Sequence, residues 1–240
     1  MERKIENIKK FAVSLLYPPV CPVCKKILHY QKLICMECDK KMLQVGEIVC
    51  QCCGKPLEKD EQEYCYDCVR KQHEYKQGIA AFRYNETVKQ TIYEFKYQNK
   101  REYAHYYATS LFAQYEKVFR SWGIEAIVPV PIYKLKKRKR GYNQAQLIAK
   151  ELSRYLHLPC VEDWLVRTKN TIPQKELNEA ARRKNLEDAF EIHGKYPYKI
   201  VLLVDDIYTT GSTIDHCAKA LKTQGCQNVY FTAVSIGQGI

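Results

Sequence analysis

Two neighbouring carboxylates and a hydroxyl-rich turn lie together near the C-terminal end of the chain. Residues 201–213 read VLLVDDIYTTGST, so Asp205 and Asp206 follow a run of apolar residues and precede the turn. Paired carboxylates can accept hydrogen bonds from ribose hydroxyls, while backbone N–H groups and hydroxyls in a turn before a helix can bind phosphate. The stretch therefore predicts a sugar-phosphate site, and the alternative is an ordinary buried strand and turn. The turn residues are Thr209, Thr210, Gly211, Ser212 and Thr213.

Eight of the twelve cysteines form four pairs with C-x2-C spacing. Each pair supplies two thiolates, and two pairs complete a closed tetrahedral zinc site of the structural type. The simplest, sequential assignment gives one tetrad of Cys21, Cys24, Cys35 and Cys38 and a second of Cys50, Cys53, Cys65 and Cys68. Interleaved pairing, a disulfide framework and pairs that no longer bind metal are the alternatives. The spacing of Cys52 is poorer, so we assign it no ligand role.

A strongly basic stretch follows a strand predicted at residues 126–131. Six of the seven residues from 134 to 140 are Lys or Arg. A loop of this composition could hold a pyrophosphate group. We favour Arg140, because the segment R-G-Y-N-Q that begins there is a compact polar turn leading into a helix. The alternatives are a solvated run of charge and a patch that contacts nucleic acid.

Residues 167–190 are long, polar and poor in core residues. Such a segment suits a lid that closes over a reactive intermediate, and the alternative is an exposed helix. Its candidate contacts are Arg167, Lys169, Gln174, Arg182 and Asn185.

Strands and helices alternate in the C-terminal part of the chain, which predicts an α/β domain with a mainly parallel sheet. We expect strands at residues 79–84, 126–131, 165–167, 189–192, 200–205 and 229–236, and helices at residues 86–97, 102–119, 142–156, 174–184 and 212–223. The predicted organisation is an N-terminal helix over residues 1–19, a double zinc ribbon over residues 20–76 and the α/β domain over residues 77–240.

The basic charge is concentrated in the α/β domain. The chain of 240 residues has a formal net charge of +12, of which residues 77–240 carry +9. Two four-thiolate zinc sites would lower the total to about +8. A basic domain suits a polyphosphate substrate or nucleic acid. No long apolar run and no convincing signal peptide is present, so we expect a cytoplasmic protein without a membrane span.

The stretch at residues 201–213 resembles the phosphoribosyl pyrophosphate (PRPP) signature of the type I phosphoribosyltransferases. Cysteine knuckles, a VPVP strand, R-G-Y-N-Q-A, then R-T…Q…L…R-x-x-N…F precede it in order. Over nearly its whole length the chain is therefore similar to the ComF family of phosphoribosyltransferase-like competence proteins. The resemblance implies that Asp205 and Asp206 hold the ribose 2′- and 3′-hydroxyls and that residues 209–213 hold the 5′-phosphate. It also implies PRPP with magnesium held mainly by substrate oxygens. Displacement of pyrophosphate needs cations on the leaving group, for which Arg140 is the first candidate and Arg182 and Lys169 are further ones.

Two functions of different classes follow. The family implies a role in genetic transformation, in the cytoplasmic handling of imported single-stranded DNA, with a ComF-type helicase and a recombinase-loading protein as partners. The basic stretch and nineteen tyrosines would offer charge and stacking surfaces for DNA. The alternative is an active phosphoribosyltransferase that transfers ribose 5-phosphate from PRPP to an acceptor that no residue identifies. An amidophosphoribosyltransferase is not supported, because there is no glutaminase domain and no cysteine follows Met1.

Overall fold

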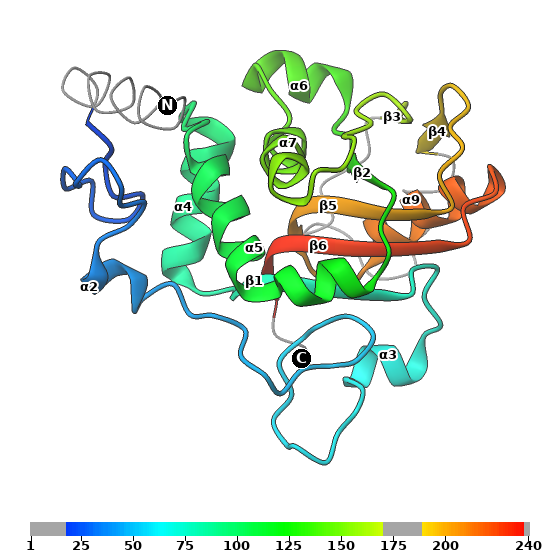
Figure 1. The fold of residues 1–240 in the computed structure, drawn as a ribbon, viewed down its shortest axis with the longest axis horizontal. Helices are drawn as coiled ribbons and strands as arrows, with labels where there is room; N and C mark the ends of the chain where they lie inside the picture. The colour runs from blue at the N-terminus through cyan, green and yellow to red at the C-terminus, as the bar shows by residue number, and fades with distance from the viewer. Residues whose placement is uncertain (1–17, 170–188, 238–240) are drawn as a thin grey trace, which may run out of the picture.

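The computed structural model describes residues 18–169 and 189–237, and its centre is a four-stranded parallel sheet (Figure 1). The strand order is β1-β6-β5-β2, with β5 and β6 in the middle. Parallel strands are buried on both faces, which explains why nearly all of β6 and the apolar first half of β5 are buried. The strands are β1 (Gln77–Arg83), β2 (Ala126–Pro129), β5 (Ile200–Tyr208) and β6 (Asn228–Ile236). The predicted, mainly parallel sheet is confirmed.

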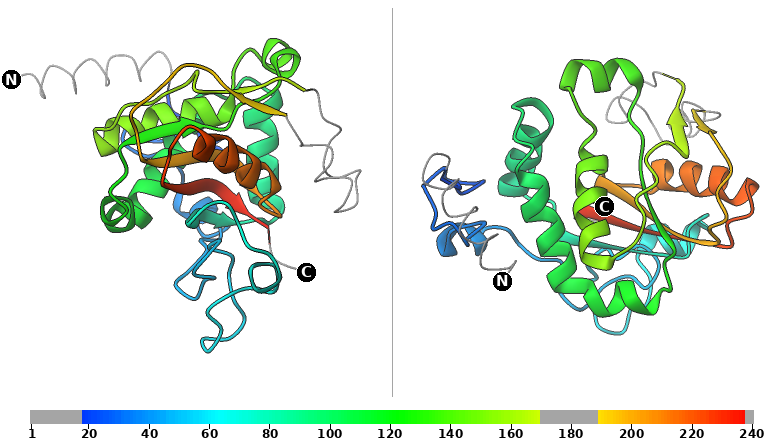
Figure 2. Two further views of the ribbon diagram at one scale, coloured as in Figure 1. Left: turned by 90° about the vertical axis from the view of Figure 1, so that its right-hand side faces the viewer. Right: turned by 45° about the horizontal axis from the view of Figure 1, so that its top comes forward.

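Different elements cover the two faces of the sheet (Figure 2). One face packs into a hydrophobic cluster with α4, α5 and α7, and the other packs with α9 and the second cysteine-rich segment. These helices are α4 (Glu86–Tyr97), α5 (Tyr103–Ser121), α7 (Gln144–Leu156) and α9 (Ser212–Thr223). Local signals set their starts: the side chain of Asn85 accepts a hydrogen bond from Val88 N at 2.8 Å and caps α4. The predicted bounds of α4 and α9 are confirmed.

A two-stranded antiparallel ribbon lies apart from the main sheet. It consists of β3 (Leu165–Arg167) and β4 (Phe190–Ile192), and its buried side chains belong to the cluster on the α9 face. The helix predicted at residues 174–184, the candidates Gln174, Arg182 and Asn185, and nearly all of the predicted N-terminal helix lie outside the described residues.

Residues 134–140 form a helix, α6 (Lys134–Arg140), so the prediction of a loop was wrong. Lys and Arg have high helix propensities, and Gly141 ends the helix in the left-handed region at a φ of +81°. None of its residues is buried, so water screens the repulsion between its charges.

The cysteine-rich region, which includes α2 (Met36–Asp39) and α3 (Tyr66–Arg70), attaches to the α/β domain at two places (Figure 1). Its first half lies beside α4, where Lys25 forms an ion pair with Glu94 and donates a hydrogen bond to the hydroxyl of Tyr103 at 2.6 Å. Its second half joins the edge of the sheet, where Gly78 N donates to Cys52 O at 2.8 Å. Within the described part of the chain, no helix has the length and apolar character needed to cross a bilayer.

Candidate functional site

The acid pair lies at the carboxyl end of β5, the edge at which open α/β sheets bind ligands. The strand continues to Tyr208, past the predicted end at residue 205, so both acids belong to the strand. Neither is sealed in the core, since the side chain of Asp206 is 14% exposed and Asp205 is also partly exposed. The backbone N of Asp206 donates a hydrogen bond to Asp205 Oδ1 at 2.8 Å. Both acids therefore lie at the carboxyl end of β5 with some access to solvent, and Asp206 points toward Lys96 of α4.

The two acids have different environments. Burial raises the pKa of Asp205 to about 7, and the neighbouring Asp206 carboxylate adds to the shift. Asp206 has a cation partner, because Lys96 Nζ of α4 lies 2.9 Å from its Oδ2. The pair thus combines an ion-paired carboxylate with one that exchanges its proton near neutral pH.

The hydroxyl-rich turn leads directly from β5 into α9. Gly211 has a φ of +78°, and a Cβ there would lie 2.7 Å from the Tyr208 hydroxyl, so only glycine fits. The hydroxyls of Thr210 and Ser212 are 3.1 Å apart. The N-cap residue of α9 is Gly211, so no N-cap side chain covers the start of this helix. Its leading N–H groups can therefore bind an anion such as a phosphate.

Several basic side chains lie near one another beside the acid pair. Arg167 of β3 interacts electrostatically with Asp205, and it is also a neighbour of Lys136 on α6. Partial burial, together with the charges of Arg167 and Arg140, lowers the pKa of Lys136. Cations that crowd one another in this way are typical of a site that binds an anion.

The segment that follows α6 holds α6 against the end of α4. Arg140 Nη2 donates a hydrogen bond to the hydroxyl of Tyr97 at 3.0 Å, and the Tyr142 hydroxyl donates to Phe95 O. Both acceptors flank Lys96, the partner of the acid pair. In this structure the R-G-Y-N-Q segment therefore positions α4, and the Arg140 guanidinium group faces Tyr97.

Sequence reasoning missed two features of the site. A single lysine on the polar face of a helix, such as Lys96, carries no local signal of its partner. The second feature is Asp215, in the first turn of α9, which accepts hydrogen bonds from Glu74 N at 3.0 Å and His73 Nδ1 at 3.1 Å and pairs with Lys71. Burial opposes its ionisation, but the bonds from His73 and Lys71 outweigh burial and lower its pKa.

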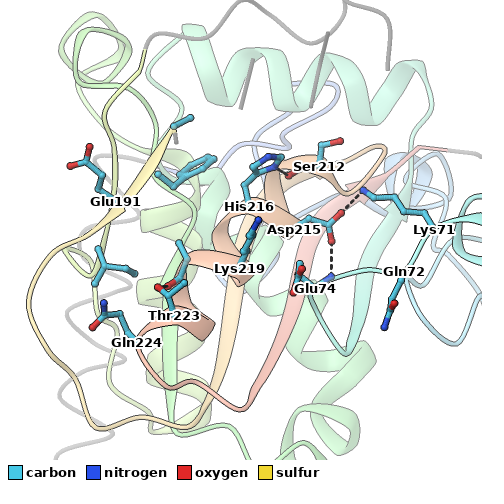
Figure 3. A pocket seen from close by; sticks show the side chains of 14 residues that line it. Lys71, Gln72, Glu74, Glu191, Ser212, Asp215, His216, Lys219, Thr223 and Gln224 are labelled. Carbon is cyan, nitrogen blue, oxygen red and sulfur yellow. Dashed lines mark hydrogen bonds and ion pairs between the residues drawn. The ribbon is translucent and has the colours of Figure 1, made fainter. Parts of the chain in front are cut away.

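A cavity of about 830 Å³ runs along α9 beside the turn (Figure 3). Ser212 lines it next to the turn, while neither member of the acid pair lines it. Its walls mix both signs of charge, with Lys71 and Lys219 as well as Glu74 and Glu191. This cavity is therefore distinct from the place where the acid pair could meet sugar hydroxyls.

The cysteines group into the two sequential tetrads. Within each tetrad the four Sγ atoms lie within 4.8 Å of one another. The sulfurs of Cys21 and Cys35 are 3.8 Å apart, and those of Cys53 and Cys65 are 3.6 Å apart. Tetrahedral zinc with Zn–S bonds of about 2.3 Å places its sulfurs about 3.8 Å apart, so both tetrads fit zinc. None of the twelve cysteines, which all lie in the described residues, forms a disulfide, so the structure favours the zinc sites over a disulfide framework.

Known proteins match both halves of the chain. The model of the double zinc ribbon domain matches residues 12–69, and that of the phosphoribosyl transferase domain matches residues 139–239. The chain is 33% identical over 173 residues to Competence protein F of Haemophilus influenzae, an alignment that covers 70% of the chain and 76% of that protein. The chain belongs to the ComF family. This ComF-family chain therefore combines a double zinc ribbon with a phosphoribosyltransferase-like α/β domain, as predicted, while the boundaries at residues 19 and 76 remain predictions.

Further relatives of the ComF-family chain are more distant. It is 27% identical over 213 residues to DNA utilization protein YhgH of Escherichia coli (strain K12), covering 88% of the chain and 87% of that protein. It is 28% identical over 168 residues to Competence protein ComFC of Bacillus subtilis, covering 67% of each. A solved hypoxanthine phosphoribosyltransferase of Staphylococcus aureus covers 57% of the chain and 73% of its own length, at 11% identity and a TM-score of 0.36, which is too loose a likeness to support an argument.

Proposed function

We propose that this ComF-family chain acts in genetic transformation, in the cytoplasmic handling of imported single-stranded DNA, and that its phosphoribosyltransferase-like domain binds PRPP with Mg²⁺. The names of the relatives, two competence proteins and a DNA utilization protein, support the first part. The second part rests on the connection from β5 to α9, where the acid pair and the glycine-capped, hydroxyl-rich turn lie together at the carboxyl edge of the sheet.

Each part of PRPP has a counterpart at this join. Asp205 and Asp206 would accept hydrogen bonds from the ribose 2′- and 3′-hydroxyls, with Lys96 orienting the second carboxylate. The turn at residues 209–213 would bind the 5′-phosphate through N–H groups and hydroxyls. Carboxylate oxygens also suit Mg²⁺, although this ion usually keeps several waters and binds mainly through substrate phosphates.

The surface near the acid pair supports DNA binding. Tyr93 and Tyr97 on α4 are 52% and 56% exposed, with ring centroids 5.0 Å apart. Arg140 lies over the ring of Tyr97, 4.9 Å from its centroid, and the basic helix α6 ends at this residue. Exposed aromatic rings beside cations stack bases and bind phosphates of single strands. The proposal that a helicase and a recombinase-loading protein are partners rests on the family resemblance alone.

Calorimetric titration of the full chain with PRPP, with and without Mg²⁺, tests the pocket. The double variant Asp205→Asn with Asp206→Asn loses the charged acceptors for two hydroxyls, so its affinity should fall about 100-fold or more. Glu116→Gln is the matched control, because it removes an exposed carboxylate on α5 and should leave the affinity unchanged. Equal PRPP affinity in the double variant and the wild type would refute the assignment.

The second candidate function is catalytic phosphoribosyl transfer, which the crowded cations Lys136 and Arg140 favour. In this reaction the bond from ribose C1 to pyrophosphate breaks, an acceptor nucleophile bonds to C1, and pyrophosphate leaves with the electron pair. Cations at the leaving group would stabilise its charge in the transition state. Pyrophosphate release on addition of candidate acceptors would support this function. Tight binding of PRPP with no release of pyrophosphate for any class of acceptor would show that the domain binds PRPP without catalysing the transfer.

A further inference from the structure

The second zinc ribbon holds a fifth thiol close to its tetrad. Cys52 lies between the ligands Cys50 and Cys53 in the sequence, and it was assigned no role above. The sulfurs of Cys52 and Cys68 and a ring nitrogen of His73 lie within 4.8 Å of one another. Cys68 is also a member of the tetrad. Three groups that can ligate a metal therefore converge beside the ribbon site, and one of them is shared with it.

His73 is arranged like a metal ligand. Its side chain is only 1% exposed, and its Nδ1 lies 3.1 Å from both carboxylate oxygens of Asp215. A carboxylate accepts hydrogen bonds, so in neutral imidazole Nδ1 carries the proton and Nε2 presents its lone pair. Across residues 18–169 and 189–237, buried Nε2 has no hydrogen-bond partner. Histidines that bind metal usually bond a carboxylate through their other nitrogen in this way.

Several contacts fix this orientation. Besides His73, Asp215 accepts a hydrogen bond from Glu74 N at 3.0 Å and forms an ion pair with Lys71. The His73 ring also stacks on Tyr75, with ring centroids 4.6 Å apart. The imidazole is therefore held in place before any ion binds, which reduces the conformational entropy lost on binding.

The local charge favours a cation. One zinc ion with four thiolates leaves a net charge of about −2 on the ribbon site. The carboxylate of Asp215 lies on the other side of His73, and Lys71 is its cation partner. A divalent ion between Cys52, Cys68 and His73 would offset much of the remaining negative charge.

We propose that Cys52, Cys68 and His73 hold a second metal ion of the zinc class, with the Cys68 thiolate bridging it to the zinc of the tetrad. Two sulfurs and one imidazole suit borderline-soft ions and exclude Mg²⁺ and Ca²⁺, which prefer oxygen ligands. Cys52 and Cys68 are both partly exposed, so solvent reaches the fourth position of a tetrahedral ion. With three protein ligands and a shared sulfur, this ion binds more weakly than those in the closed tetrads.

The test starts from the full chain dialysed until it holds two zinc ions. Titration with Co²⁺ followed by its visible absorption should add one further ion to the wild type. Cys52→Ser and His73→Gln should each abolish this third equivalent while keeping two zinc ions and the wild-type circular dichroism. Cys160→Ser is the matched control, because it removes a partly exposed thiol outside the ribbons and should leave the third equivalent intact.

A second readout tests the shared thiolate. When Co²⁺ occupies both positions, a bridging sulfur couples the two ions magnetically, so the moment per ion should fall below that of isolated Co²⁺. A wild type that binds no third ion would overturn the proposal, and so would a third ion that both variants retain. If His73→Gln does not fold, Cys52→Ser alone decides, because its side chain is partly exposed and the substitution is nearly isosteric.

Discussion

Replacing Asp205 by Asn should change how the stability of the fold depends on pH. Burial, reinforced by the charge of Asp206, raises the pKa of Asp205 to about 7 in the folded protein. The pKa in the unfolded chain is near the usual value of about 4. The folded state therefore holds this proton more tightly, so the stabilisation is complete below about pH 4 and is lost as the pH rises to about 7.

The magnitude follows from the width of this window. Three pKa units correspond to about 4 kcal/mol, of which about 2.5 kcal/mol falls between pH 5 and pH 8. The ionisation of Asp205 depends on the charge of Asp206, and water reaches both acids, so we expect about 2 kcal/mol. Over this range the wild type should lose that much stability relative to Asp205→Asn, which cannot ionise at this position.

Urea unfolding of both proteins at pH 5 and pH 8 measures the difference. The zinc thiolates titrate alike in both proteins, so their contribution cancels in the comparison. In an Asp206→Asn background the pH effect of Asp205→Asn should shrink, because the second cause of the shift is gone. Stability curves of the wild type and Asp205→Asn that run parallel from pH 5 to pH 8 would refute the reasoning.

Three further predictions concern the metal sites, the basic helix and the ion pair at the acid pair. Metal analysis of the dialysed chain should find two zinc ions per molecule, and their removal by a chelator should lower the melting temperature; one ion or none would contradict the two tetrads. Alanine at Lys136, Lys137 and Lys139 should weaken single-strand binding and reduce the salt slope by about 2; an unaltered slope would exclude α6 from the DNA contact. Lys96→Met leaves the carboxylate of Asp206 without its cation, so urea titrations should show a free energy of unfolding lower by about 1–3 kcal/mol. An unchanged free energy of unfolding would show that the ion pair does not stabilise the fold.

Local signals made part of the fold predictable. The bounds of α4 and α9 could be predicted, because helix starts depend on nearby residues, as the side chain of Asn85 that caps α4 shows. The tetrads followed from the spacing of cysteine pairs, which reflects the geometry of a tetrahedral ion. The acid pair and the turn could be identified because both belong to a single βα unit.

Contacts between distant parts of the chain could not be predicted in this way. Lys96 meets Asp206, and His73 meets Asp215, only because the fold brings separate elements together. The basic stretch was assigned to a loop on composition, whereas helix propensity and the glycine after it produce α6. The orientation of Arg140 toward Tyr97 depends on packing between α6 and α4, which no pattern in either segment records.

The pairing of β1 with β6 has a consequence for synthesis of the protein on the ribosome. The first strand of the sheet pairs in parallel with the last one, so Gln77 lies beside Tyr230. A nascent chain can complete its zinc ribbons early, but one edge of β1 stays unpaired until β6 has been synthesised. Such long-range pairing slows folding and exposes the growing chain to aggregation. A stop codon before residue 228 would therefore abolish the sheet as a whole, instead of merely shortening it.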